Sequence, residues 1–261
     1  MRKNAIREML KDDQPTLGTH VHSTWPTTVE AIGHTGMFDY VEFVAEYAPY
    51  DLYSLENFCR AIELFNMGAM IKVDQEHKTY LAQKAIGSGF QSVLFADSRT
   101  VEDVQMCVRA VRPDTPEDGG HHGAAMRRFA HMSYGGTPEY VEALNDIVVV
   151  IMIEKKSAVE QLEDILSVDG IDMIQWGPAD YSMSIGQPGN RGSHNIREVE
   201  RQVIETSMKA GIPARAEIGS VDEAKYYLDM GVRHFCLGTD INILYNWLKT
   251  NGEALRYEIK G

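Results

Sequence analysis

Short apolar runs alternate along the chain with longer segments in which apolar residues recur every three or four positions. Eight of the runs are typical of β-strands: Leu17–His22, Asp39–Val44, Ala69–Val73, Ser92–Ala96, Ile147–Glu154, Ile171–Trp176, Ile212–Glu217 and Arg233–Gly238. The segments between them have a helical period: Thr28–Thr35, Leu55–Phe65, Lys78–Ser88, Val101–Arg112, Ser157–Leu166, Ile196–Ala210 and Val221–Met230. Strand and helix in regular alternation predict a parallel sheet, and eight such units in 261 residues predict a single (β/α)8 TIM barrel.

Two segments interrupt this alternation. The first residues, MRKNAIREMLKDDQP, predict a charged amphipathic helix ahead of the barrel. A long connection, Pro113–Asn145, separates the fourth and fifth units. Connections of this length in a compact domain are usually functional. Because it follows the fourth strand, we expect it to lie over the C-terminal face of the barrel and to close over the site of a neighbouring subunit.

Charge and composition exclude some classes of partner. Asp and Glu number 38 against 25 Lys and Arg, and the resulting net charge of −13 repels nucleic acid and anionic membranes. No run of residues is apolar for long enough to span a bilayer, so no membrane partner is expected. The three cysteines, Cys59, Cys107 and Cys236, lack metal-binding spacing, and such a sparse, odd set is typical of reduced thiols in a cytoplasmic protein.

Ionisable residues gather at the predicted C-terminal ends of the strands, where barrels of this type have their active sites. Glu154 ends the most apolar strand, and Asp180 follows the next one. Adjacent parallel strands bring these carboxylates together, and they would repel each other unless a cation lay between them. Oxygen ligands suit Mg²⁺ or Mn²⁺. The turn at Gly177 would then present the amides of Ala179 and Asp180 to an anionic group.

Each of these residues also has a purely structural interpretation. A carboxylate after a strand often caps the next helix. Lys72, at the end of the third strand, either binds a substrate oxygen at the barrel mouth or extends to water. His20 and His22 alternate with Val21 and so point to the same side of their strand, where inward side chains would be candidate bases near neutral pH.

The stretch IEKKSAVEQLEDILSVDGIDMIQWGPADYSMSIGQPG resembles the signature of the HpcH/HpaI aldolase family, and EAIGHTGMFDYVEF and MGVRHFCLGTD resemble further segments of it. Members are metal-dependent class II pyruvate aldolases related to 2-dehydro-3-deoxyglucarate aldolase. The resemblance implies that Glu154 and Asp180 are metal ligands and that the turn with Gly177 and Ala179 binds the pyruvate carboxylate. It also implies a homo-oligomer, a hexamer in which subunits exchange their last helix.

The chain departs from the family pattern where the family keeps its proton-transfer residues. The segment VAEYAPYD has Tyr47 in place of the general-base histidine and Val44 in place of an acid. A second acid, which supports that histidine, would fall near Gly87, so the His-Asp dyad is absent. Lys72 stands where the family has an arginine that stabilises the transition state, and Met152 stands where a glutamine contacts substrate. Lysine keeps the charge without the bidentate geometry.

Proton transfer must therefore use other residues. We expect His22 or His20 to act as the base and Tyr47 as an acid or an orienting group, because an unperturbed tyrosine donates a proton more readily than it accepts one. Lys72 would stabilise the negative charge of an enolate.

These features together predict a carbon–carbon lyase that acts on a 2-oxo acid through a pyruvate enolate held by Mg²⁺ or Mn²⁺. Two alternatives remain open on the sequence. One is a related enzyme that condenses, decarboxylates or hydrolyses a keto acid through the same enolate. The other is a barrel that binds keto acids without turnover, which the loss of the dyad favours. The many ionisable residues at the strand ends favour catalysis over binding alone.

Overall fold

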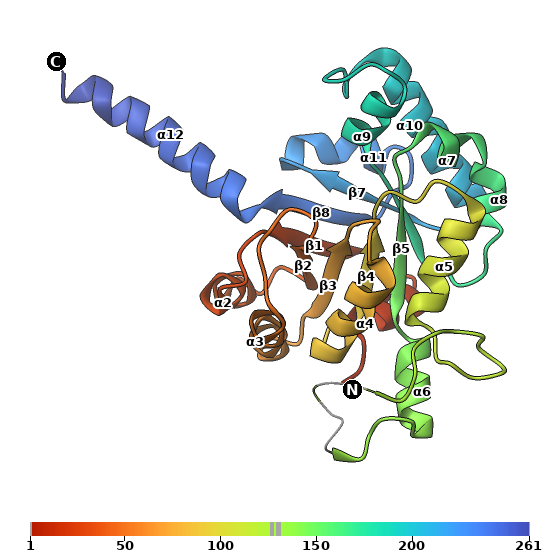
Figure 1. Ribbon diagram of the computed structural model, residues 1–261. Helices are drawn as coiled ribbons and strands as arrows, with labels where there is room; N and C mark the ends of the chain where they lie inside the picture. The colour runs from red at the N-terminus through yellow and green to blue at the C-terminus, as the bar shows by residue number, and fades with distance from the viewer. Residues whose placement is uncertain (1, 126–127, 129–131, 261) are drawn as a thin grey trace.

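The computed structural model describes residues 2–125, 128 and 132–260. Within these ranges, eight strands close into one barrel (Figure 1). They are β1 (Thr16–Val21), β2 (Tyr40–Val44), β3 (Gly68–Val73), β4 (Ser92–Phe95), β5 (Val148–Ile153), β6 (Met173–Trp176), β7 (Ala214–Ile218) and β8 (His234–Thr239). Each strand pairs in parallel with the next, and β8 pairs with β1. The predicted (β/α)8 barrel is confirmed.

Helices cover the outside of the barrel between successive strands. They are α2 (Pro26–His34), α3 (Leu52–Glu63), α4 (Lys78–Ser88), α5 (Val101–Val111), α7 (Lys156–Glu160), α8 (Leu162–Leu166), α9 (Pro178–Ser184), α10 (His194–Lys209), the 3₁₀ turn η2 (Val221–Glu223) and α11 (Ala224–Leu228). Local sequence sets several of their starts: Asp51 and Thr100 cap α3 and α5 with reciprocal side-chain and backbone hydrogen bonds. The helix predicted over 157–166 is divided at Gln161 into α7 and α8.

The interior of the barrel has an apolar part and a polar part. Apolar side chains from β3 to β6 form one cluster with Tyr40, and it includes Met70, Leu94, Val150 and Met152. Polar and ionisable side chains from β7, β8, β1 and β2 line the rest of the interior: Arg215, Cys236, His20 and Glu42 are buried, and Glu217 is exposed near the C-terminal end of β7. Buried charges need partners, so the polar part must be a connected network.

The N-terminal helix α1 (Ala5–Lys11) lies across the N-terminal ends of the strands. Ile6 is fully buried against Tyr40 and Met70 inside the barrel. The Arg7 guanidinium pairs with Asp172 and donates to the carbonyl of Ile147, just ahead of β5. This helix therefore closes the end of the barrel opposite the expected site.

The segment 113–145 lies at this same N-terminal end, so our expectation that it covers the C-terminal face is wrong. The backbone N–H of Arg128 bonds to the carbonyl of Gly87 near the end of α4, and its guanidinium pairs with Glu63 at the end of α3. The reason is that α5 follows β4 and returns the chain to the opposite end before the segment begins. It ends in α6 (Pro138–Asn145). Residues 126–127 and 129–131 lie outside the described residues.

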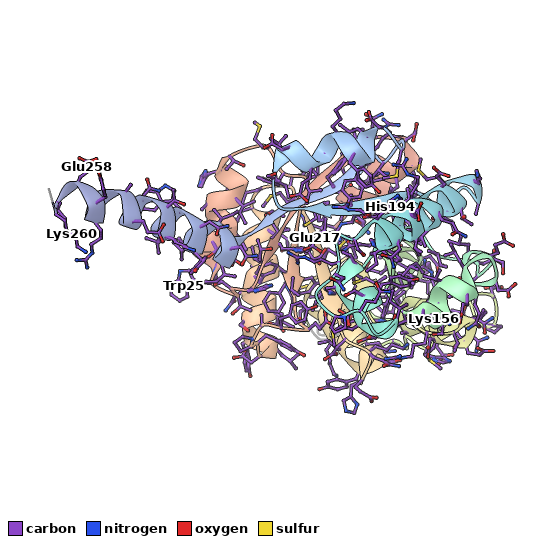
Figure 2. The ribbon with its side chains drawn as sticks, turned by 90° about the horizontal axis from the view of Figure 1, so that it is seen from above. Trp25, Lys156, His194, Glu217, Glu258 and Lys260 are labelled. Carbon is purple, nitrogen blue, oxygen red and sulfur yellow. The ribbon has the colours of Figure 1, made fainter. Side chains whose placement is uncertain are left out.

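The last helix, α12 (Asp240–Glu258), projects away from the barrel. Figure 2, turned by 90°, shows Glu258 and Lys260 at its far tip. No residue of this helix is buried, although many are large and apolar: Ile241, Ile243, Leu244, Tyr245, Trp247, Leu248, Leu255 and Tyr257. Leu17, Phe235 and Leu237, on the outer face of β1 and β8, are only half-buried. No helix in the described ranges is both long enough and apolar enough to cross a membrane.

Candidate active site

Glu154 and Asp180 follow neighbouring strands at the C-terminal end of the barrel. Glu154 comes directly after β5 and is 3% exposed, and Asp180 lies in the first turn of α9, after β6. Gly177 joins β6 to α9, and its N–H donates to the carbonyl of Ile153 over 3.1 Å. A Cβ on Gly177 would lie 2.6 Å from Oε2 of Glu154. The glycine therefore leaves the space that the glutamate carboxylate occupies.

The Glu154 carboxylate is in an environment that disfavours its charge. Burial raises its pKa to about 7, and the nearby Asp180 carboxylate adds to the rise, while Lys72 opposes it. The backbone N–H of Asp97 donates to Oε1 over 2.7 Å and also opposes the rise. Asp97 has a φ of +56°, a left-handed conformation that non-glycine residues seldom adopt. Strained backbone of this kind is common at functional sites.

A lysine already lies between two of the site carboxylates. Nζ of Lys155 is 2.8 Å from Oδ1 of Asp180 and forms an ion pair with Asp97. Lys155 is 8% exposed. Sequence reasoning missed Lys155, because only the fold brings the loop after β4 beside the start of α9. The position between these acids therefore attracts positive charge.

Lys72 lies inside the barrel mouth at the end of β3. Its Nζ is 2.6 Å from Oε2 of Glu46 and donates to the Tyr47 hydroxyl over 3.2 Å. Burial alone would lower the pKa of Lys72, but Glu46 and Tyr47 raise it above its usual range. Partial burial raises the pKa of Tyr47, which Lys72 partly opposes. Near neutral pH this corner of the site therefore holds an ammonium group and a neutral phenol.

The structure separates the two histidines that the sequence grouped. The ring of His22 lies beside that of Tyr47, with centroids 6.1 Å apart. The backbone N–H groups of His22 and Ser23 donate to the carboxylate of Asp240, at the start of α12, over 2.9 and 3.2 Å. His22 therefore belongs with Tyr47 and Lys72 at the mouth.

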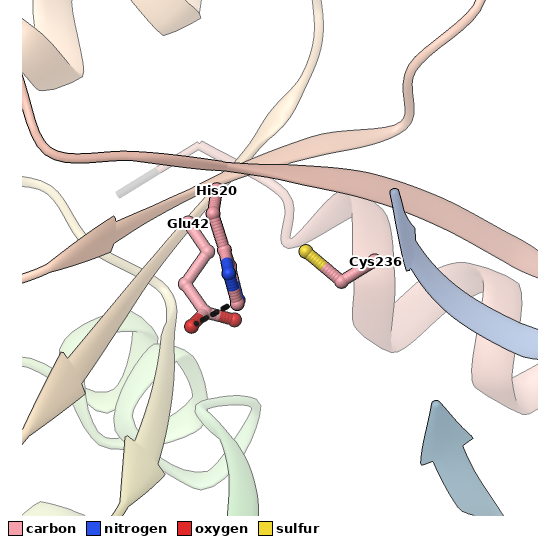
Figure 3. A group of neighbouring side chains, drawn as sticks. All are labelled: His20, Glu42 and Cys236. Atoms are coloured by element: carbon pink, nitrogen blue, oxygen red, sulfur yellow. Dashed lines mark ion pairs between the residues drawn. The ribbon is translucent and has the colours of Figure 1, made fainter. Parts of the chain in front are cut away.

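His20 is 4% exposed and lies in the polar part of the barrel interior, beside Glu42 and Cys236 (Figure 3). Its Nε2 is 2.9 Å from Oε1 of Glu42, and its Nδ1 is 3.3 Å from Oε1 of Glu217. Burial alone would lower the pKa of His20, but Cys236, Glu42 and Glu217 raise it well above its ordinary value. The imidazolium form is therefore favoured when no other cation is present.

Arg215 connects this group across the barrel. It is 2% exposed, donates from Nε to the Tyr40 hydroxyl over 2.6 Å, and contacts Glu42 and Gln175. Burial alone would raise the pKa of Glu42, but Arg215 and His20 lower it to about 2. Sequence reasoning overlooked Glu42 and Arg215. Each is a charged residue within an apolar strand, with an apolar residue on either side. That pattern could have identified both as candidates for the barrel interior.

Comparison with known proteins places the chain in a family. Residues 17–246 match the model of the family described as HpcH/HpaI aldolase/citrate lyase. The chain is 28% identical over 245 residues to a 2-keto-3-deoxy-L-rhamnonate aldolase from Escherichia coli K12, covering 93% of this chain and 89% of the relative. It is 24% identical over 242 residues to a hydroxypyruvate/pyruvate aldolase from Paraburkholderia phytofirmans, covering 91% and 92%.

The fold comparison is consistent with the sequence comparison. The crystal structure of an HpcH/HpaI aldolase from Desulfitobacterium hafniense superposes with a TM-score of 0.87 at 18% identity, covering 97% of each chain. The family match spans the barrel from β1 to the start of α12 and includes the strand ends that carry Glu154 and Asp180. The chain therefore belongs to the HpcH/HpaI aldolase/citrate lyase family, as the sequence motifs indicated.

Proposed function

We propose that this chain is a metal-dependent carbon–carbon lyase of the aldolase type that acts on a 2-oxo acid through its enolate. The named aldolases among its relatives support the reaction class. The observation that carries the proposal is the placement of Glu154 and Asp180 after neighbouring strands, beside Gly177, where a side chain would collide with Glu154. Lys72 and Lys155 are nearby cations that favour the charged form of Glu154.

The donors fit a hard divalent ion. Glu154 and Asp180 supply only carboxylate oxygens, which Mg²⁺ and Mn²⁺ prefer. The raised pKa of buried Glu154 and the ion pair of Lys155 with Asp180 both indicate an environment that favours added positive charge. When bound, such an ion supplies Lewis-acid stabilisation of the enolate charge.

The residues of the chain then divide the remaining tasks. The first-turn N–H groups of α9, including that of Ala179, have no acceptor within the helix and would receive the substrate carboxylate. Lys72 would stabilise the negative charge that develops on the substrate oxygen. His22 and Tyr47, adjacent at the mouth, would accept and donate the proton in place of the absent dyad.

His20 is the other base that the sequence suggested. It lies between two carboxylates that favour its protonated form, so His22 is the better candidate. One variant tests this assignment. His22→Gln should slow proton exchange without changing the binding of a substrate analogue, because His22 is not among the proposed ligands.

We also propose a homo-oligomer, with six subunits by analogy with the family. Apolar α12 and the half-buried outer face of β8 and β1 support it, since no described residue of the same chain buries either of them fully. The buried, unpaired thiols of Cys59, Cys107 and Cys236 fit the reducing cytoplasm.

Calorimetric titration of oxalate, a planar analogue of the pyruvate enolate, tests the site. We expect binding that requires Mg²⁺ or Mn²⁺, that is lost in Asp180→Ala and that is kept in Asp169→Ala, a matched change at an exposed acid. No binding with either metal, in a folded protein, would contradict the proposal.

Exchange of the pyruvate methyl protons in D₂O then tests catalysis, and binding without exchange would favour a keto-acid-binding barrel.

A further inference from the structure

The polar half of the barrel contains a second group of potential ligands. Cys236 on β8, His20 on β1 and Glu42 on β2 come from three successive strands, and each offers one ligand atom within 4.8 Å of the others (Figure 3). His20 is opposite Glu42 in the sheet register. Side chains on strands have little freedom to move apart, so these donors are held near one another by the barrel itself.

Two buried atoms in this group face each other. Nε2 of His20 and Oε1 of Glu42 form an ion pair of 2.9 Å, and neither atom has a hydrogen bond to any other described residue. His20 is 4% exposed and Glu42 is fully buried. In this pair a proton on Nε2 joins the two side chains, and a metal ion bound by both atoms would take the place of that proton.

The remaining atoms of both side chains are oriented by other residues. Nδ1 of His20 is 3.3 Å from Oε1 of Glu217, and Arg215 contacts Oε2 of Glu42. A carboxylate on the far nitrogen of a histidine is the usual support for a metal-binding imidazole. Nε2 of His20 and Oε1 of Glu42 are left as the ligand atoms beside Cys236.

We propose that His20, Glu42 and Cys236 bind a zinc ion, at a site distinct from the oxygen-lined site of Glu154 and Asp180. Thiolate, imidazole and carboxylate are the ligand types of zinc, whereas Mg²⁺ avoids sulfur. Three protein ligands leave a fourth position for water or a substrate oxygen. The site does not depend on the proposed lyase activity.

Charge and geometry are compatible with this ion. Zinc with a Cys236 thiolate adds the same net charge as a protonated His20 with a Cys236 thiol. The charges of Glu42, Glu217 and Arg215 are therefore balanced equally in both forms. Zinc bonds of about 2.0–2.3 Å place the ligand atoms roughly 3.5 Å from one another. Side-chain rotations that move these atoms by about an ångström would therefore complete the site.

Cobalt is the spectroscopic probe of the site. We expect metal-free protein titrated with Co²⁺ to develop near-ultraviolet sulfur-to-cobalt charge-transfer absorption, and Zn²⁺ to displace it. Cys236→Ser should abolish the absorption, whereas Cys59→Ser and Cys107→Ser, changes at the other buried thiols, should retain it. Glu217→Gln should weaken zinc binding about 10- to 100-fold, as changes to supporting carboxylates do.

Asp180→Ala separates this proposal from the proposed function. That variant should lose metal-dependent oxalate binding and keep the cobalt–thiolate absorption. X-ray absorption of zinc-loaded wild-type protein should show one sulfur ligand for each zinc. This measurement tests the proposal without a variant, in case Cys236→Ser does not fold. Absence of a thiolate band in wild-type protein, a band that persists in Cys236→Ser, or zinc without a sulfur ligand would each overturn the proposal.

Discussion

Gly177 is the residue whose missing side chain shapes the candidate site. In Gly177→Ala the added methyl carbon would lie 2.5 Å from Cβ of Glu154 and 2.6 Å from its Oε2. Forcing such contacts costs about 1–3 kcal/mol. We expect a lower thermal midpoint and metal-dependent oxalate binding at least about tenfold weaker, a change of about 1.4 kcal/mol by calorimetry.

Gly192 provides the control for this substitution. A Cβ at Gly192 meets no atom within 4 Å, so Gly192→Ala should leave both measurements unchanged. Oxalate affinity in Gly177→Ala equal to that of wild type would show that the Glu154 carboxylate has room to spare.

His122 gives the protein an acid-sensitive position away from the site. It is 3% exposed, and burial lowers its pKa to about 4 from an ordinary value of 6.5. The unfolded chain therefore binds a proton at His122 more readily than the folded protein does. The contribution of neutral His122 to the free energy of unfolding is complete above pH 6.5 and is lost as the pH falls towards 4. The loss amounts to about 3 kcal/mol.

The exposed neighbour His121 allows a matched comparison. We expect His122→Gln to flatten the fall in urea midpoint between pH 6.5 and 4 and His121→Gln to leave it as steep as in wild type. Equal slopes in the two variants would mean that another group controls acid unfolding.

Individual site residues were predictable to different degrees. Glu154 and Lys72 stand at strand ends and Asp180 follows one closely, and strand ends are visible in the pattern of apolar residues. Lys155 was not predictable, because its partners come from separate elements, Asp97 from the segment after β4 and Asp180 from the first turn of α9. Contacts across the barrel interior, such as Arg215 with Glu42, also depend on closure of the sheet and not on any local signal.

At the scale of elements, strands were easier to predict than the longest helix. Each strand has a buried apolar run, and the observed bounds differ from the predicted ones by few residues. Helix α12 was not among the predicted helices, although Ile241, Leu244, Tyr245 and Leu248 recur at the helical spacing i, i+3, i+4 and i+7. The segment 113–145 was placed at the wrong end, because a helix reverses the direction of the chain before it.

Helix α12 supports a prediction about assembly. Light scattering after size-exclusion chromatography should give wild-type protein a mass several times that of one subunit. Leu244→Glu with Trp247→Glu should reduce it, because charges would replace apolar side chains that we expect another subunit to cover. Lys249→Glu, an exposed polar position on the same helix, is the control. A wild-type monomer would contradict the proposed oligomer.

At the scale of the whole molecule, metal removal should not unfold the protein. Lys155 already compensates the charges of Asp97 and Asp180, so EDTA should leave the circular dichroism spectrum and thermal midpoint nearly unchanged. Lys155→Met should lower the thermal midpoint of metal-free protein and reduce its free energy of unfolding by at least about 1 kcal/mol, because the two carboxylates lose their partner. Added Mg²⁺ should restore part of this lost stability.

Lys156 is the neighbouring control, since its ammonium pairs with Glu160 at the surface. Lys156→Met should behave as wild type with and without EDTA. Unfolding of wild-type protein on chelation would show that Lys155 does not substitute for the ion.

The bridging ammonium of Lys155 also determines the order of events after synthesis. Proteins whose ligands repel one another without metal cannot fold until the metal arrives. This chain carries its own counter-ion in Lys155, so on the proposed metal dependence folding would come first and loading second. The supply of divalent ion would then control how many molecules are active and would leave the number of folded molecules unchanged.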